Sequence, residues 1–248
     1  MQLISGCSGA GFFARQRVLV LGLLALALLS GCTSNPTSKR DPLEPMNRGI
    51  YQFNDNVDRA VIKPVATGYR KLPDPVRTGV GNFFGNLGDV LIIANDLLQF
   101  KMSQAASDAT RLVVNTTVGL CGIFDVATKW GFPKHDNDFG QTLGKWGVPS
   151  GPFLMLPILG PSTFRDTVGL AVDGHYNLVY NYTPVSDRNV AIAVNGVHQR
   201  SEFLDASKIL DEASLDPYMF LRDAYLQRRD AKIRDGKPRP ISMDDETD

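Results

Sequence analysis

The apolar residues recur with the period of an α-helix along most of the chain. One stripe has spacings of three or four residues, which place its members on one helical face: Ile50, Phe53, Val57 and Val61. Pro64 is expected to end this helix, because proline lacks the N–H that a helix interior requires. The pattern therefore predicts a first helix that stops before Pro64.

Two further helix starts share one signal, an aspartate cap followed by a proline at the first helical position. They are Asp74-Pro75 and Asp216-Pro217, and each precedes an apolar stripe of helical period. Residues 89–113 and 187–212 also have helical patterns. No alternation of apolar and polar residues is long enough to build a sheet. The chain is therefore predicted to be mainly α-helical, of the all-α class.

The N-terminus has the parts of an export signal. Arg15 and Arg17 precede an apolar run from Val18 to Leu29, which is too short to span a bilayer. The run closes in Leu29-Ser30-Gly31-Cys32, which resembles the bacterial lipoprotein signal. We therefore expect residues 1–31 to be removed and Cys32 to be acylated. The alternative is an uncleaved signal anchor with an incidental cysteine.

Acylation would fix the location of the protein. Two or three acyl chains make detachment from a membrane negligible, whereas a single chain binds only marginally. By analogy with bacterial lipoproteins, Thr33 in place of an aspartate after Cys32 favours the outer membrane. The expected location is the periplasm-facing leaflet of that membrane.

Composition excludes several classes of function. The full chain has 26 basic and 26 acidic residues. Removal of residues 1–31 takes away Arg15 and Arg17, so the remaining 217 residues have 24 basic and 26 acidic residues and a net charge of −2. Without a basic surplus, binding to nucleic acid is not expected. Cys121 would be the last free cysteine of the mature chain, so an internal disulfide is excluded, and its neighbours suggest a small buried residue.

Polar segments flank the predicted folded part. Residues 32–41 are expected to be an acylated tether, because residues 33–41 have no apolar side chain that could pack. Residues 234–248 combine glycine, prolines and an acidic run, which predicts a disordered tail. The helical domain is therefore expected over residues 42–233.

Glycine and proline are concentrated between Gly119 and Gly169. This region contains the apolar segment from Phe153 to Leu159, which is too short to cross a bilayer. The segment is either part of the core or backbone that approaches a ligand or hinges, for which glycine is the permissive residue. The candidate rim or hinge residues are Gly140, Gly144, Gly147 and Gly151.

No catalytic or metal-binding motif emerges. The three histidines are far apart and lack a second ligand three or four residues away, so neither a metal site nor a cofactor is expected. Ser150 does not have the Gly-x-Ser-x-Gly spacing of a nucleophile elbow, and Asp138-Phe139-Gly140 lacks the other kinase motifs. The protein is not expected to be an enzyme.

Certain polar residues stand among apolar neighbours. Arg111 and Asn115 lie around an apolar stretch of a predicted helix, and Arg165-Asp166 follows the Gly/Pro-rich segment. They either hydrogen-bond within the fold, with Arg111 or Arg165 pairing with an interior carboxylate, or form the polar lining of a membrane-embedded helical protein, in which charged side chains face a water-filled interior.

Several blocks resemble the MlaA (VacJ) family of outer-membrane phospholipid lipoproteins, and the resemblance covers essentially residues 41–230. Asp41-Pro42-Leu43-Glu44-Pro45-Met46-Asn47-Arg48 opens the domain, and Phe53-Asn54 follows in the first helix. Further blocks are Asn82-Phe83-Phe84, Arg111 with Asn115-Thr116, Phe139-Gly140-Gln141-Thr142-Leu143-Gly144, Arg165-Asp166 and Asp216-Pro217-Tyr218. The segment 184–200, which includes Arg188, departs most from the family pattern.

The resemblance implies a ring-shaped bundle of amphipathic helices, embedded in one leaflet around a central amphipathic channel. It also implies removal of mislocalised phospholipid from the outer leaflet and transfer to a soluble periplasmic carrier of the MlaC type, often while bound to trimeric porins. The candidate polar lining is Asn54, Arg111, Asn115, Arg165 and Asp166. The alternatives are a structural envelope lipoprotein that acts as a scaffold, and an enzyme that acts on lipids. Direction of transport, headgroup preference and porin identity are left open.

Overall fold

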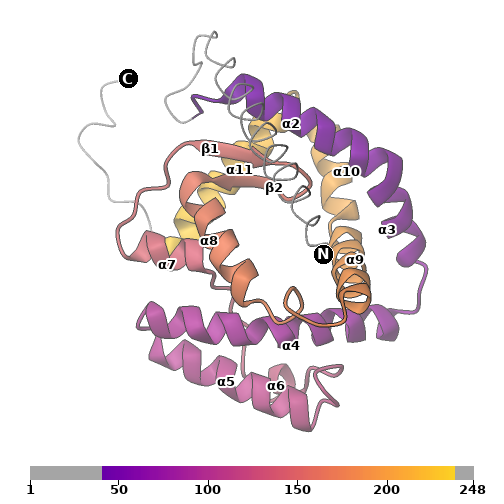
Figure 1. Ribbon diagram of the computed structural model, residues 1–248, viewed down its shortest axis with the longest axis vertical. Coiled ribbons are helices and arrows are strands. Elements are labelled where there is room, and N and C mark those ends of the chain that lie inside the picture. Colours follow the sequence, from indigo (N-terminus) through magenta and orange to yellow (C-terminus); the bar gives the residue numbers. More distant parts are fainter. Residues whose placement is uncertain (1–40, 238–248) are drawn as a thin grey trace, which may run out of the picture.

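A computed structural model describes residues 41–237, so the predicted signal, Cys32 and residues 238–248 lie outside the described residues. Helices dominate, with one short hairpin (Figure 1). In chain order the elements are α2 (Glu44–Val57), η1 (Asp58–Ile62), α3 (Lys63–Tyr69), α4 (Asp74–Leu98), α5 (Met102–Thr117), α6 (Val126–Lys129), α7 (Phe139–Lys145), β1 (Phe153–Leu156), β2 (Gly160–Thr163), α8 (Phe164–Tyr176), α9 (Val185–Glu202), α10 (Leu204–Ala213) and α11 (Pro217–Ile233).

The first helix does not stop before Pro64, and that prediction was wrong. A π-helical turn, η1, joins α2 to α3, and the Lys63 N–H donates to the Asp58 carbonyl five residues earlier. Pro64 then lies in the first turn of α3, where a missing N–H is tolerated. The wider turn therefore lets the chain continue past a residue that normally ends a helix.

Two other helix boundaries also differ from the predicted ones. A helix start at Asp74 is confirmed, but the predicted cap was wrong, because Asp74 is the first residue of α4, the N-cap is Pro73, and no side chain caps the helix. The helix then continues without a break to Leu98, and α5 begins at Met102. Between them Phe100 has φ 58° and the Lys101 N–H returns to the Asp96 carbonyl. The predicted helix 187–212 is divided at Phe203 into α9 and α10. The sequence has no glycine or proline at either break, and the apolar pattern of helical period continues through both. The pattern therefore could not predict them.

The apolar segment of the Gly/Pro-rich region forms an antiparallel hairpin, which the search for alternating residues missed. Phe153 pairs with Thr163 and Leu156 with Gly160, and Ile158 and Gly160 in the turn have positive φ. Each strand has only four residues, too few for an alternating pattern to be recognised. Phe153 and Met155 are buried, whereas Ile158 and Leu159 in the turn are exposed, so only the strand part of this segment is core.

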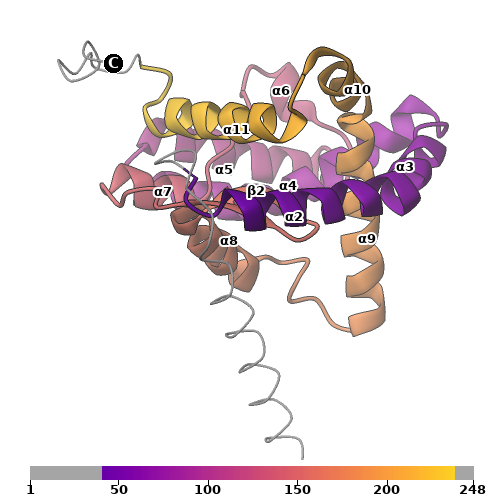
Figure 2. The ribbon, with the colours of Figure 1, turned by 90° about the horizontal axis from the view of Figure 1, so that it is seen from above.

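The elements make a closed circuit of contacts. In order around it, α2 packs on β1, β1 on β2, β2 on α8, α8 on α7, α7 on α4, α4 on α9, α9 on α3, and α3 returns through η1 to α2. Figure 1 shows this circuit face-on, with α5 and α6 outside α4. In Figure 2 α11, α10 and α6 lie on one side, and α9 runs steeply across the thickness of the molecule. None of the described helices is long and apolar enough to cross a membrane.

The apolar core is small. Its centre is Phe153, Met155 and Tyr218, with partly buried neighbours from α2 and α11 packed against it. Asp41, placed by the sequence in the tether, is fully buried, where Asn47 and Tyr218 donate hydrogen bonds to its carboxylate. Cys121 is exposed, so the expectation of a buried cysteine was wrong. It lies in the turn after α5, where both Leu120 and Cys121 have positive φ.

Candidate functional site

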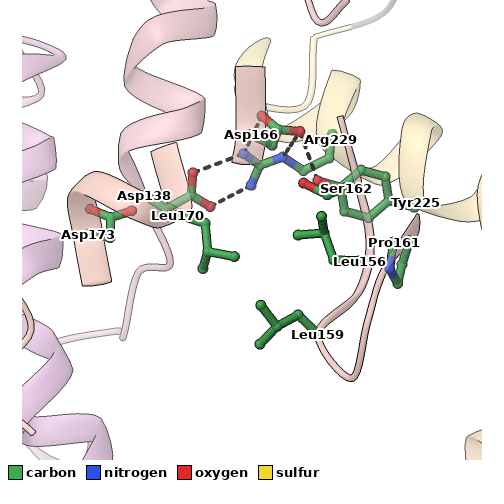
Figure 3. Close-up of a pocket in the computed structure, with 10 residues that line it drawn as sticks. All are labelled: Asp138, Leu156, Leu159, Pro161, Ser162, Asp166, Leu170, Asp173, Tyr225 and Arg229. Atoms are coloured by element: carbon green, nitrogen blue, oxygen red, sulfur yellow. Dashed lines mark hydrogen bonds and ion pairs between the residues drawn. The ribbon is translucent and has the colours of Figure 1, made fainter. Parts of the chain in front are cut away.

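A cavity of about 190 Å³ lies where the hairpin meets α7, α8 and α11. We call it the Arg229 pocket. It has polar and apolar sides, which Figure 3 shows together. Its lining residues are Asp138, Leu156, Leu159, Pro161, Ser162, Asp166, Leu170, Asp173, Tyr225 and Arg229.

The polar side is assembled by helix ends. Asp138 caps α7 by accepting a hydrogen bond from the Gln141 N–H at 2.8 Å. Asp166 lies in the first turn of α8, whose cap is Thr163. Tyr225 and Arg229 are one turn apart on α11, so both side chains reach Asp166. Three elements distant in sequence thus converge on one guanidinium.

Arg229 binds both carboxylates. Its Nη2 donates to Asp138 Oδ1 at 2.9 Å and to Asp166 Oδ1 at 2.8 Å, while Nε donates to Asp166 Oδ2. Burial alone would raise the pKa of Asp138 and of Asp166, but the hydrogen bonds and charge of Arg229 hold both pKa values below the usual range. Both aspartates are therefore charged at neutral pH, and the cluster is ionic.

Arg165 is a second arginine that binds Asp166. It is 6% exposed, and its Nη2 donates to Asp166 Oδ1 at 2.9 Å. The sequence left open whether Arg165 and Asp166 pair inside the fold or line a polar surface. Asp166 does both, since it pairs with two arginines and lines the Arg229 pocket, whereas Arg165 is not among the lining residues.

Arg111 and Asn115 belong to a second polar site, between α4, α5 and α6. Arg111 donates to the Thr128 hydroxyl at 2.7 Å, to the Phe132 carbonyl at 2.6 Å and to the Asp125 carboxylate at 3.1 Å. Hydrogen bonds from Thr128, Arg111 and Asn115 outweigh the effect of burial and lower the pKa of Asp125 to about 2. Arg111 and Asn115 line a cavity of about 160 Å³ there.

Asn54 lies apart from both sites and holds the hairpin turn. Its Nδ2 donates to the Leu156 carbonyl at 2.8 Å, and its Oδ1 accepts from the Ile158 N–H at 2.7 Å. The amide thus replaces the hydrogen-bond partners that the turn lacks. The five candidate lining residues therefore occupy three separate places.

The candidate rim or hinge glycines have different surroundings. Gly140 is in close contact with α8, because a Cβ on Gly169 would lie 2.3 Å from the Gly140 nitrogen. A Cβ on Gly144 would lie 2.7 Å from Ile233. Gly147 and Gly151 have φ values of 89° and 67°, which favour glycine. The first two permit close packing and the last two permit turns.

Sequence reasoning missed Asp138, Tyr225 and Arg229. The sequence has a cap signal at Asp138, with Gln141 three residues later, but Asp138 was considered only as part of a kinase motif. Arg229 lies in a helix rich in exposed charge, which gives no sign of its burial. Among residues 41–237, no group of three potential ligands is placed to hold a metal ion.

A third buried polar cluster joins α4 to α5. Asp96 and Asp108 are both fully buried, and each has one carboxylate oxygen without a hydrogen-bond partner. Asn137 donates to Asp96 at 2.6 Å, and His135 Nδ1 lies 2.8 Å from Asp108 Oδ2. Burial and the neighbouring Asp108 raise the pKa of Asp96 to about 6.

Known proteins resemble this chain over most of its length. The sequence model of the MlaA lipoprotein family matches residues 39–232. The "Intermembrane phospholipid transport system lipoprotein MlaA" of Escherichia coli (strain K12) is 38% identical over 234 residues, which cover 90% of this chain and 92% of that protein. The protein of the same name from Haemophilus influenzae is 32% identical, with coverages of 90% and 93%. A solved structure described as "Structural basis for maintenance of bacterial outer membrane lipid asymmetry" matches with a TM-score of 0.69 and 34% identity, and the match covers 78% of this chain and 98% of that one.

Proposed function

The chain belongs to the MlaA lipoprotein family, and from this membership we propose that it is the outer-membrane lipoprotein of an intermembrane phospholipid transport system. It removes mislocalised phospholipid from the outer leaflet and so maintains lipid asymmetry. Cys32 carries the acyl chains, and the helical domain sits in the periplasm-facing leaflet. The role is transport rather than catalysis.

The observation that carries the proposal is the reversed placement of polar and apolar side chains. Among residues 41–209 and 214–237, 18 polar or charged residues are buried against seven apolar ones, while 37 large apolar side chains are exposed. A water-soluble domain of this size buries mostly apolar residues. A domain surrounded by acyl chains has no need to do so, because lipid covers its apolar surface.

The closed circuit of elements supports passage of lipid through the protein. Transfer of a phospholipid headgroup through hydrocarbon is costly, and polar side chains along the route lower that cost. We propose that the Arg229 pocket belongs to this route, with Asp166 on its polar side and Leu156 and Leu159 on its apolar side. Arg111 and Asn115 contribute a second polar surface, and Asn54 fixes the hairpin.

The glycines of the α7 region, Gly140, Gly144, Gly147 and Gly151, supply the rim and any hinge of the route. A soluble periplasmic carrier of the MlaC type receives the lipid, and trimeric porins hold the protein in place. Family membership supports the proposal of these partners.

Surface-exposed phospholipid in cells with and without the protein tests the proposed function. Deletion should increase phospholipid in the outer leaflet, and the wild-type gene should reverse the increase. A scaffold without transport activity would leave lipid asymmetry unchanged, and that result would contradict the proposal.

The membrane-embedded state has its own test. Cys32→Ala protein, exported without acyl chains, should still need detergent to stay monodisperse, because its apolar surface persists. If it is monodisperse in plain buffer, acylation alone accounts for membrane association and the embedded ring is wrong.

A further inference from the structure

We propose that the Arg229 pocket binds the ammonium group of a zwitterionic phospholipid headgroup, such as phosphatidylethanolamine, in preference to an anionic headgroup. This inference rests on the proposed function and adds a headgroup preference to it. It follows from the hydrogen bonds, charges and apolar side of the pocket.

Arg229 is the one cationic side chain among the lining residues, and its guanidinium is already bound to two carboxylates. Four hydrogen bonds from Arg229, two to Asp138 and two to Asp166, use four of the five N–H donors of the guanidinium. A phosphate would have to displace a carboxylate to gain the bidentate contact that arginine offers. Figure 3 shows the guanidinium enclosed between the two aspartates. The pocket is therefore poorly suited to an anionic group.

Asp173 provides a carboxylate that pairs directly with no cation among the described residues. It lines the pocket and accepts hydrogen bonds from two neutral donors, the Phe139 N–H at 2.9 Å and Asn95 Nδ2 at 3.3 Å. Within the described residues it forms no ion pair. Three carboxylates thus line the pocket against one guanidinium, and with Arg165 included the cluster still has an excess of one negative charge.

This excess charge selects for a cation. Burial raises the pKa of Asp173, since desolvation disfavours its charged form, and the nearby Asp138 acts in the same direction, while the two hydrogen bonds and the charge of Arg229 oppose this rise only in part. An ammonium beside Asp173 would offset the penalty and complete its hydrogen bonding. A phosphate or glycerol headgroup would bring repulsion or no charge at all.

The apolar side favours a lipid over a free amine. Leu156, Leu159 and Leu170 line the pocket, and the turn continues this surface outward, since Ile158 and Leu159 are each 66% exposed. The cavity volume of about 190 Å³ suits a headgroup but not a whole phospholipid. The acyl chains would therefore lie along the exposed hairpin turn.

Lipid competition tests the inference. Acylated full-length protein is exchanged against vesicles of equimolar phosphatidylethanolamine and phosphatidylglycerol, and bound lipid is extracted and quantified by mass spectrometry. We expect enrichment of phosphatidylethanolamine by about fivefold, the order expected for one partly screened charge pair. Asp173→Asn should reduce the enrichment to near unity, whereas Asp173→Glu, which keeps the charge, should retain most of it.

The matched control is Asp187→Asn, which removes the same charge from an exposed position in the first turn of α9. It should keep the wild-type ratio. Thermal unfolding of each variant reports whether it is folded. Free ethanolamine at millimolar concentration should not displace the lipid, since it lacks the apolar part.

Two outcomes would overturn the inference while leaving transport intact: lipid bound without headgroup preference, or a preference that Asp173→Asn does not change. Displacement by free ethanolamine would mean a simple amine site and would also overturn it. Absence of any bound lipid would contradict the proposed function itself.

Discussion

Arg229 of α11 donates a hydrogen bond from Nη2 to Asp166 Oδ1 of α8 at 2.8 Å, across 63 residues of sequence. The contact joins the C-terminal helix to the helix that follows the hairpin, and Asp138 joins α7 to the same guanidinium. The polar cluster therefore acts as a structural junction as well as a candidate part of the lipid route.

Removal of the Arg229 charge should destabilise the fold strongly. Arg229→Met leaves Asp138 and Asp166 with much less compensation, and the free energy of unfolding should fall by about 3–5 kcal/mol. Denaturant unfolding in detergent, followed by circular dichroism, measures this change.

The adjacent arginine is the matched control. Arg228 is 65% exposed and lies 3.7 Å from Asp136, so Arg228→Met should change the free energy of unfolding by less than about 1 kcal/mol. Equal effects of the two substitutions would mean that the buried cluster does not hold the three helices together.

The contact between α7 and α8 depends on Gly169. A Cβ at this position would lie 2.3 Å from the Gly140 nitrogen, which is backbone and cannot rotate away. Gly169→Ala should therefore separate the helices and lower the free energy of unfolding by about 1–3 kcal/mol. The same unfolding measurement applies.

Gly196 in α9 provides the comparison, because a Cβ there would meet nothing within 4 Å. Gly196→Ala should be neutral or stabilising by up to about 1 kcal/mol, since alanine favours the helix. A destabilisation as large as that of Gly169→Ala would show that helix packing is not the cause.

Asp96 should make stability depend on pH. Burial and Asp108 raise its pKa from 3.8 to about 6 in the folded state, so folding favours the protonated carboxyl. This stabilisation is complete below about pH 4 and is lost as the pH rises through about 6. The midpoint of thermal unfolding should therefore decline over this range.

Asp96→Asn stays neutral, so its midpoint of thermal unfolding should lack the part of the decline that Asp96 causes. The midpoint of this variant relative to the wild type should therefore rise between pH 4 and about 6.5. Asp187→Asn on the exposed end of α9 should follow the wild-type curve. Parallel curves for Asp96→Asn and the wild type would exclude Asp96 as the titrating group.

Local sequence signals predicted two of the helix starts. Asp74-Pro75 and Asp216-Pro217 begin α4 and α11, because a proline in the first turn acts locally, although only Asp216 caps its helix and Asp74 is the first residue of α4. The breaks at Phe100 and Phe203 were not predictable in this way. At Phe100 the backbone has a positive φ and the Lys101 N–H returns to the Asp96 carbonyl, in a turn that contains no glycine or proline to signal it.

The candidate site was also predicted only in part, because the sequence signals for it are local. Arg111, Asn115, Arg165 and Asp166 were noticed as polar residues among apolar neighbours, and all four are buried. Their partners Asp125 and Arg229 were missed, as was Asp138, the second carboxylate that Arg229 binds. A pairing across 14 to 91 residues is visible only once the helices are packed.

The sequence by itself determined the mainly helical class and the family and predicted an export signal, because these depend on short-range composition and on motifs. Only the tertiary structure decided that polar side chains gather inside while apolar ones lie outside, and that one arginine binds two distant aspartates. The periodicity of a helix specifies that it has two unlike faces. Which face is turned inward depends on the polar or apolar surfaces of the other helices and on whether water or lipid surrounds the domain. The choice of face is therefore a property of the whole protein rather than of any segment.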